Sequence, residues 1–116
     1  MQELSLPIIN SGYNLYKNIA DITNHCDKRW RFSLGVSVEN TILSCLENLI
    51  FAKNAPKPLK AGYLLKANTD LEICVLKLRL FLEFDLANET RIFQCQAICR
   101  EIGRMLGGWI KSLQNS

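Results

Sequence analysis

Basic side chains near the C-terminal end are the residues of this chain best suited to chemistry. In the segment EIGRMLGGWIKSL, Arg104 and Lys111 flank two adjacent glycines, and Arg100 directly precedes the segment. Up to residue 90 ten Lys and Arg balance ten Asp and Glu, whereas from residue 91 onward four basic residues oppose only Glu101. The net charge of +3 therefore comes from this last part of the chain. Basic side chains bind phosphate groups with release of counterions, which indicates nucleic acid as a partner.

A second basic cluster surrounds a tryptophan in the sequence HCDKRWRF. Lys28, Arg29 and Arg31 flank Trp30, and an aromatic ring among cations can stack on an unpaired base. The alternative for both clusters is an ordinary solvated surface, because a charge of +3 is small for a nucleic-acid-binding monomer. A symmetric ring would repeat the same basic surface around its axis and so strengthen its field.

Catalytic and metal-binding patterns are missing from the sequence. The single histidine, His25, adjoins Cys26, too close in sequence to predict a Cys/His dyad. The glutamates show no HExxH, DxD or ExxH spacing. Cys95 and Cys99 stand four residues apart, without the histidine or second cysteine pair that a zinc site needs. We therefore expect a protein that is not an enzyme and that holds no metal and no cofactor.

Length and composition predict one globular domain over residues 1–116, with 48% apolar and 22% charged residues. The start of the chain lacks the basic region and apolar run of a signal peptide. Charged residues interrupt its most hydrophobic segment, residues 71–86, so we expect no membrane association. The five cysteines contain no CxxC pair, which favours reduced thiols in a cytoplasmic protein.

Four amphipathic segments separated by breaks predict an all-α, antiparallel up-down four-helix bundle. They cover approximately residues 7–24, 33–54, 60–85 and 89–113, and HCDKRWRF and NAPKPLK form two of the connections. Ser5 and Asn88 are the expected N-caps of the first and last helices. The first helix is expected to turn one set of residues inward: Ile9, Tyr13, Tyr16, Ala20 and Thr23.

The segment 60–85 is apolar on two sides at helical spacing. One side carries Leu64, Leu71, Val75, Leu78 and Leu82, and the roughly opposite side carries Ile73, Leu76, Leu80 and Phe84. A helix with two apolar faces needs a partner on each of them. The second face is therefore either an oligomer interface, which we favour, or a sign that this helix is central in the bundle.

The last segment separates a basic side from an apolar one. Four positions fall within about 60° of one another at 3.6 residues per turn: Arg100, Arg104, Gly107 and Lys111. The apolar rhythm of Ile102, Leu106 and Trp109 continues through the adjacent Gly107 and Gly108, although a glycine inside a helix costs about 0.5–1 kcal/mol relative to alanine. Three explanations stay open for the glycine pair, namely close approach of a ligand, close helix packing, or a distortion late in the helix.

Three parts of the sequence resemble the Avd family, the accessory variability determinants of diversity-generating retroelements. They are RFSLGVSVEN, YLLKANTDLEICVLKLRL and, most specifically, EIGRMLGGWIKSL, and the resemblance extends from about Trp30 to Leu113. It implies a four-helix bundle that assembles into a basic, barrel-like homopentameric ring without catalytic activity. The implied partners are the reverse transcriptase of the retroelement and its template-repeat RNA, which together support mutagenic cDNA synthesis and retrohoming.

A related group is the four-helix proteins encoded by intervening sequences in ribosomal RNA genes. Membership there would imply an oligomeric scaffold whose partners are proteins only or belong to the ribosome. For the Avd family, Arg79 matches the arginine of the third-helix motif. The residues that match the fourth-helix signature are Arg104, Gly107, Gly108, Trp109 and Lys111. The chain departs from the family at Val75 and Ser37, where a basic residue is frequent, and Lys77 is expected to compensate partly from another face.

Overall fold

The computed structural model describes residues 2–114 and is an all-α bundle of four long helices. Those helices are α1 (Gln2–Asn24), α3 (Val36–Asn54), α4 (Lys57–Glu83) and α5 (Glu89–Gln114). A short α2 (Lys28–Trp30) and a π-helical turn η1 (Arg31–Gly35) lead directly into α3. No strand occurs between residues 2 and 114, which confirms the predicted helical class. Residues 1, 115 and 116 of the predicted domain lie outside the described range.

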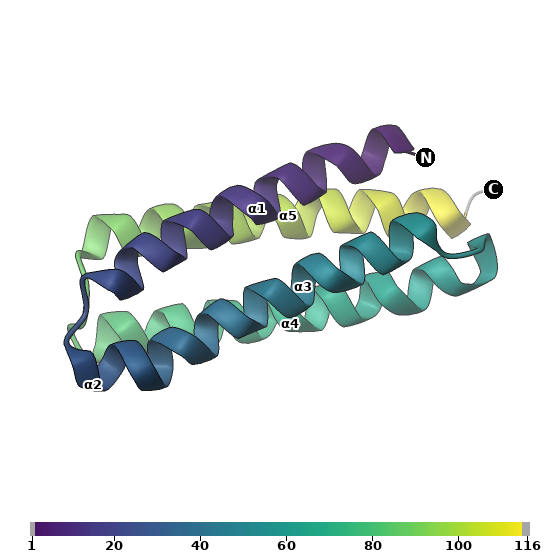
Figure 1. Cartoon of the computed structure of the whole chain (residues 1–116). Helices are drawn as coiled ribbons and strands as arrows, with labels where there is room; N and C mark the ends of the chain where they lie inside the picture. The colour runs from purple at the N-terminus through teal and green to yellow at the C-terminus, as the bar shows by residue number, and fades with distance from the viewer. Residues whose placement is uncertain (1, 115–116) are drawn as a thin grey trace.

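Each long helix packs against two others, in the cyclic order α1, α3, α4, α5. Figure 1 shows the connections after α1 and after α4 at one end of the bundle, and the connection between α3 and α4 at the other, where α1 begins and α5 ends. The bundle measures 48 × 22 × 19 Å, so every long helix spans most of its length. Side chains far apart in sequence therefore lie at the same level of the bundle.

The core is one apolar cluster to which every long helix contributes. The amphipathic character predicted for residues 33–54, 60–85 and 89–113 is confirmed by their buried residues, which are Val38, Ile42, Cys45, Leu49, Leu64, Leu71, Leu78, Ile92, Cys95, Ile102, Leu106 and Trp109. In α4 the cluster also includes Ala67, Cys74 and Phe81. In α3 and α5 the spacing of the apolar residues was enough to orient the helix, and α4, which is apolar on two sides, buries the side of Leu64, Leu71 and Leu78.

The inward face predicted for α1 is wrong by part of a turn. Tyr13 is 58% exposed, and among the predicted set only Thr23 is fully buried. The buried face is formed instead by Ile8, Leu15, Ile19 and Ile22. These aliphatic side chains fill the core, whereas a tyrosine would have to bury its hydroxyl with a partner. The helix also begins at Gln2, so Ser5 lies inside it and is not an N-cap.

The predicted connection HCDKRWRF is helical over much of its length. After α1 ends, residues Lys28–Trp30 form one α-helical turn and Arg31–Gly35 one π-helical turn. A Cβ atom at Gly35 would lie 3.2 Å from Thr23 Cβ and 3.2 Å from the Trp30 carbonyl oxygen. Glycine is therefore the residue that lets this turn pack closely against α1. The helical character of this connection could not be predicted from the spacing of apolar residues, because a π-helical turn breaks the 3.6-residue rhythm.

Turn chemistry sets the remaining helix ends. The helix α4 begins at Lys57, earlier than the predicted residue 60, because Pro58 fits in a first helical turn where no backbone N–H bond is required. At the end of α4, Asp85 adopts a φ of 54°, and the Leu86 N–H donates to the Phe81 carbonyl. This is a Schellman-type cap with aspartate in the left-handed position. The predicted N-cap of α5 is confirmed, since Asn88 Oδ1 accepts from the Arg91 N–H at 3.1 Å.

All five cysteines are free thiols buried in the bundle. Burial, reinforced by Asp70, raises the pKa of Cys45 to about 12, so this thiol stays protonated at neutral pH. Among residues 2–114, no three or more His, Cys, Asp or Glu side chains are grouped so that they could hold a metal ion. Within the same range, no helix combines the length and apolar character needed to cross a membrane.

Leu78→Ala should lower the free energy of unfolding by about 2–5 kcal/mol, because the shortened side chain leaves a cavity in the core. Urea unfolding followed by circular dichroism measures this change. The control is Leu65→Ala on the same helix, whose side chain is 58% exposed and whose truncation should change stability by less than about 0.5 kcal/mol. Equal destabilisation by both variants would contradict the assigned rotation of α4.

Candidate nucleic-acid interface

The outer side of α5 carries an exposed row of basic residues. This α5 basic stripe consists of Arg100, Arg104, Gly107 and Lys111, with Gly108 at its border, and all five are exposed. The opposite side of the helix is the buried face that includes Ile102 and Leu106. Since the core fixes the rotation of the helix, the stripe points away from the bundle. The structure thus brings these predicted residues onto one accessible surface.

The charges of the stripe differ in how they are engaged. Arg104 binds Glu101 through two nitrogens, and Nε lies 3.1 Å from the carboxylate. This hydrogen bond lowers the pKa of Glu101 and raises that of Arg104. Both side chains are open to solvent, so salt screens the pair. Arg100 and Lys111 have no ion-pair partner among residues 2–114, which leaves them available to phosphate.

The glycine pair lies in uninterrupted α-helix. The helix α5 continues to Gln114, and neither Gly107 nor Gly108 has a positive φ. A Cβ atom at either position would meet nothing within 4 Å. A helix distortion and close packing within the bundle therefore do not explain these glycines. The remaining explanation is that a ligand or partner molecule approaches the helix closely at this point. The glycine N–H groups are already bonded within the helix, so the glycines permit close contact but supply no hydrogen-bond donors.

Trp109 is a core residue and not a contact for a ligand. Its side chain is 1% exposed, and it is the largest of the fully buried residues. Its Nε1 has no hydrogen-bond partner among the described residues. The match of Trp109 to the family signature is therefore structural in this chain, because a base or a partner protein cannot reach the ring.

The two basic residues expected from α4 lie in different settings. Arg79 is exposed and pairs with Glu83 one turn later, with 3.1 Å between Nε and the carboxylate. Lys77 instead points to α3, where Nζ donates to Thr41 Oγ1 at 2.7 Å and to the Ser37 carbonyl at 3.3 Å. The expectation that Lys77 supplies charge to a nucleic acid is not supported, because its ammonium group is used between two helices.

The cluster around Trp30 is partly structural. The Trp30 ring stacks on Phe84 with 5.3 Å between centroids, and the Arg29 guanidinium lies 4.8 Å from the Trp30 centroid. Arg31 donates to the carbonyls of Asn24 and Cys26 and so satisfies the end of α1. Of the three predicted cations, Lys28 and Arg29 are exposed and Arg31 is half-buried. Trp30 already has aromatic and cationic neighbours in its own chain, so its role as a base-stacking platform is weakened.

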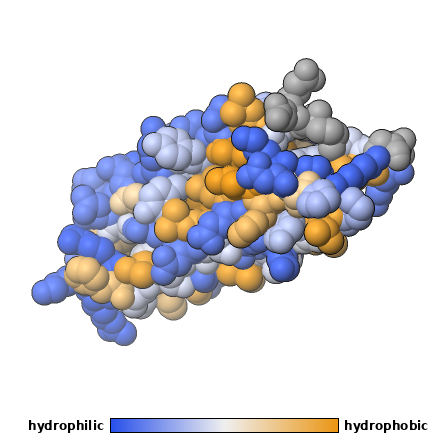
Figure 2. All heavy atoms as spheres, turned by 45° about the vertical axis from the view of Figure 1, so that its right-hand side comes forward, coloured by the Kyte–Doolittle hydropathy of each residue, from blue (hydrophilic) through white to orange (hydrophobic). Residues whose placement is uncertain are grey.

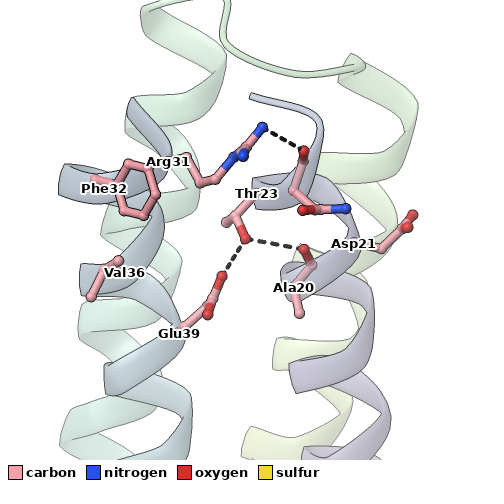
Figure 3. Close-up of a pocket in the computed structure, with 8 residues that line it drawn as sticks. Ala20, Asp21, Thr23, Arg31, Phe32, Val36 and Glu39 are labelled. Carbon is pink, nitrogen blue, oxygen red and sulfur yellow. Dashed lines mark hydrogen bonds between the residues drawn. The ribbon is translucent and has the colours of Figure 1, made fainter. Parts of the chain in front are cut away.

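A hollow of about 580 Å³ lies between α1 and the start of α3, and no pattern in the sequence indicated it. Figure 3 shows Thr23 at its centre, with its hydroxyl within hydrogen-bonding distance of both Glu39 and the Ala20 carbonyl, and with Arg31 reaching the end of α1. Its lining combines carboxylates, an arginine and exposed apolar groups. Asp21, at its edge, is bound by Arg91 of α5. Most of these polar groups therefore serve the fold: the contact between Thr23 and Glu39 joins α1 to α3, and the ion pair between Asp21 and Arg91 joins α1 to α5.

The second apolar face predicted on α4 is exposed and not central. Leu76 is 60% exposed, and Ile73 and Phe84 are also exposed, while Leu80 is half-buried. These four residues form the α4 apolar stripe. Phe84 meets Trp30 at one end, so it contributes to the fold as well as to the surface. The alternative that α4 is the central helix is thus excluded, since none of these side chains is fully buried within the bundle.

A further apolar surface, which the sequence analysis missed, runs along α1, η1 and α3. Its exposed side chains are Leu6, Tyr13, Phe32, Val36, Leu43 and Ile50, named here the α1–α3 apolar strip. Figure 2 shows hydrophobic side chains gathered in the middle of one face of the bundle among hydrophilic neighbours. The signal in the sequence was the seven-residue spacing of Val36, Leu43 and Ile50 on one side of α3, which the core pattern of the same helix hid.

Comparison of the chain with protein-family models gives no match, and neither does comparison with curated proteins.

Replacing Gly107 or Gly108 by alanine should stabilise the protein by about 0.5–1 kcal/mol each, because the added Cβ meets no neighbour. The control is Gly62→Ala in α4, whose Cβ would also meet nothing within 4 Å. All three variants should raise the midpoint of urea unfolding. If the pair permits close approach of a phosphate chain, Gly107→Ala should also weaken nucleic-acid binding, whereas Gly62→Ala should not. A decrease in the stability of Gly107→Ala would contradict the open setting of this glycine.

Proposed function

We propose that this protein is a non-catalytic accessory protein of a diversity-generating retroelement, which binds the reverse transcriptase and the template RNA to support mutagenic cDNA synthesis and retrohoming. One observation carries the proposal. The glycine pair lies in straight helix with open space above it, in line with exposed Arg100, Arg104 and Lys111. A bare helix surface between cations suits a phosphate backbone, since phosphate contacts need charge and proximity but no particular base.

The resemblance to the Avd family supplies the identity of the partners. Residues matching its fourth-helix signature that lie on the exposed side of α5 are Arg104, Gly107, Gly108 and Lys111. Arg79, matching the third-helix motif, is exposed on the adjacent α4. The match at Trp109 supports the fold alone, because the residue is buried. The proposal therefore rests on the exposed part of the signature.

Self-assembly into a homopentameric ring is the second part of the proposal. Connections at alternating ends of the molecule support the antiparallel, up-down arrangement of the protomer (Figure 1). A cyclic ring needs two different surfaces on each copy, because each protomer contacts the next through a heterologous interface. The α4 apolar stripe and the α1–α3 apolar strip are two such surfaces on different helices. Packing one against the other would cover apolar area that a monomer leaves in water.

A second candidate function is an oligomeric scaffold of the ribosomal-RNA intervening-sequence type, whose partners are proteins only or belong to the ribosome. The extent of exposed apolar surface favours it, since such patches mark protein contacts more often than RNA contacts. Neighbouring genes separate the two. A reverse-transcriptase gene with a template and variable repeat pair supports the accessory function, and a position inside a ribosomal RNA gene supports the scaffold.

Changing Arg79, Arg100 and Arg104 to alanine together should weaken RNA binding and flatten its dependence on salt. The slope of log K against log salt is negative for such binding, and each phosphate of a single strand that the protein no longer neutralises reduces its magnitude by about 0.7. The slope of the triple variant should therefore be shallower by about two. Fluorescence anisotropy with a labelled RNA at several salt concentrations measures both quantities. All three side chains are exposed, so the fold should be retained.

The matched control for this variant removes the same charge elsewhere. Lys17, Lys53 and Lys57 are exposed on α1, α3 and α4, and their replacement by alanine should leave most of the affinity and slope unchanged. Equal effects of the two triple variants would indicate nonspecific attraction by net charge. Unchanged affinity and slope in the arginine variant would remove these residues from the interface.

Leu76→Glu should dissociate the assembly, because the α4 apolar stripe would then bury an unpaired charge. Light scattering should give the wild-type protein a mass of about five times the 13.2 kDa of one chain, and the variant the mass of a monomer. Leu59→Glu introduces the same charge at another exposed position of α4, outside the stripe, and should leave the mass unchanged. A wild-type protein that is monomeric at micromolar concentration would end the ring proposal.

A further inference from the structure

An aromatic side chain shares the outer side of α5 with the basic stripe. Phe93 is 49% exposed and precedes Arg100 by seven residues, which places it close to the same angular position on the helix. Arg104 and Lys111 follow at helical spacing from Arg100, so Phe93 begins the line that they continue. No aromatic ring among residues 2–114 stacks on Phe93. The ring is therefore an unoccupied platform at one end of a row of cations.

The length and charge of this surface fit a short single strand. From Phe93 to Lys111 the helix rises about 27 Å at about 1.5 Å per residue. Known single-strand sites begin at about four nucleotides and combine cations along the backbone with aromatic rings that stack on bases. The side of α5 between these two residues offers both kinds of group. Glu101 is the only carboxylate of α5 beyond its first turn, and Arg104 already neutralises it.

We propose that the outer side of α5 binds single-stranded nucleic acid, with Phe93 stacking on an unpaired base while Arg100, Arg104 and Lys111 contact phosphates. This inference rests on the proposed nucleic-acid-binding function and adds the strand type and a base-contacting residue. Gly107 lies between Arg104 and Lys111 and lets the sugar-phosphate chain approach the helix surface.

Duplex nucleic acid fits this surface less well. In a duplex the base faces are stacked on each other, so a phenylalanine on a rigid helix has no base face to contact. Reading base edges in a groove requires side chains that reach inward, and the glycine pair provides none. A protein partner is also disfavoured, since the surface joins one isolated ring to three cations and not to a broad apolar patch.

The test compares Phe93 variants on three labelled probes by fluorescence anisotropy. The probes are a single-stranded oligouridine, the same strand carrying abasic sites, and an RNA duplex of equal length. Phe93→Ala and Phe93→Leu should weaken binding of the oligouridine by roughly 5- to 150-fold, the decrease expected for one stacked base. Phe93→Trp should retain the affinity. The salt dependence should stay that of the wild type in every variant, because no phosphate contact is removed.

The probes separate stacking from charge. Wild-type protein should bind the abasic strand and the duplex more weakly than the oligouridine, and Phe93→Ala should not weaken those two further. Circular dichroism checks the fold, which a substitution at an exposed position should not disturb.

Two results would overturn the inference while leaving the proposed function intact. The first is equal affinity of wild-type protein and Phe93→Ala for the oligouridine. The second is a failure of Phe93→Ala to self-assemble with RNA binding unchanged, which would assign this ring to a protein interface. Failure of the wild-type protein to bind any of the three probes at low salt would instead remove the proposed RNA-binding function itself.

Discussion

The rotation of α5 about its own axis is the constraint that decides which of its side chains, including those of the basic stripe, face solvent. Ile92, Ile102, Leu106 and Trp109 are buried on one side of the helix, and at 100° per residue this places Arg100 and the rest of the basic stripe on the other. A helix that rolled by one residue would move Trp109 into water and an arginine toward the core. The large apolar area of the indole makes such a rotation unfavourable.

The glycine pair illustrates how a local destabilisation can be retained in a well-packed helix. Alanine at Gly107 or Gly108 would favour the helix and would meet no neighbour, so folding alone does not select glycine at these positions. Naturally occurring proteins commonly keep such unfavourable choices at functional sites. The cations on either side of the pair make phosphate the most fitting group to approach it.

The protein also exposes more apolar side chains than its core requires. Leu76 on α4 and Phe32 on η1 are each more than half exposed, on different elements of the bundle. Isolated exposed side chains are ordinary, but these belong to rows at helical spacing. Rows on two different helices can join copies head to tail, and such a contact closes into a ring when the rotation between copies allows it. Assembly would also multiply the modest charge of one chain.

The sequence by itself determined the helical class, the core faces of three helices and the position of the basic stripe, because apolar residues that recur at helical spacing orient a helix. It also predicted the Asn88 cap, which depends on contacts within one helical turn. It misplaced Tyr13 and treated Trp30 as accessible, since pattern alone does not distinguish a buried aromatic ring from an exposed one. The apolar spacing placed Trp109 on the core side, and only the family resemblance grouped it with the exposed signature residues. Only tertiary packing decided those positions. It placed Trp30 against Phe84, bound Lys77 to α3, and left the surface over Gly107 open.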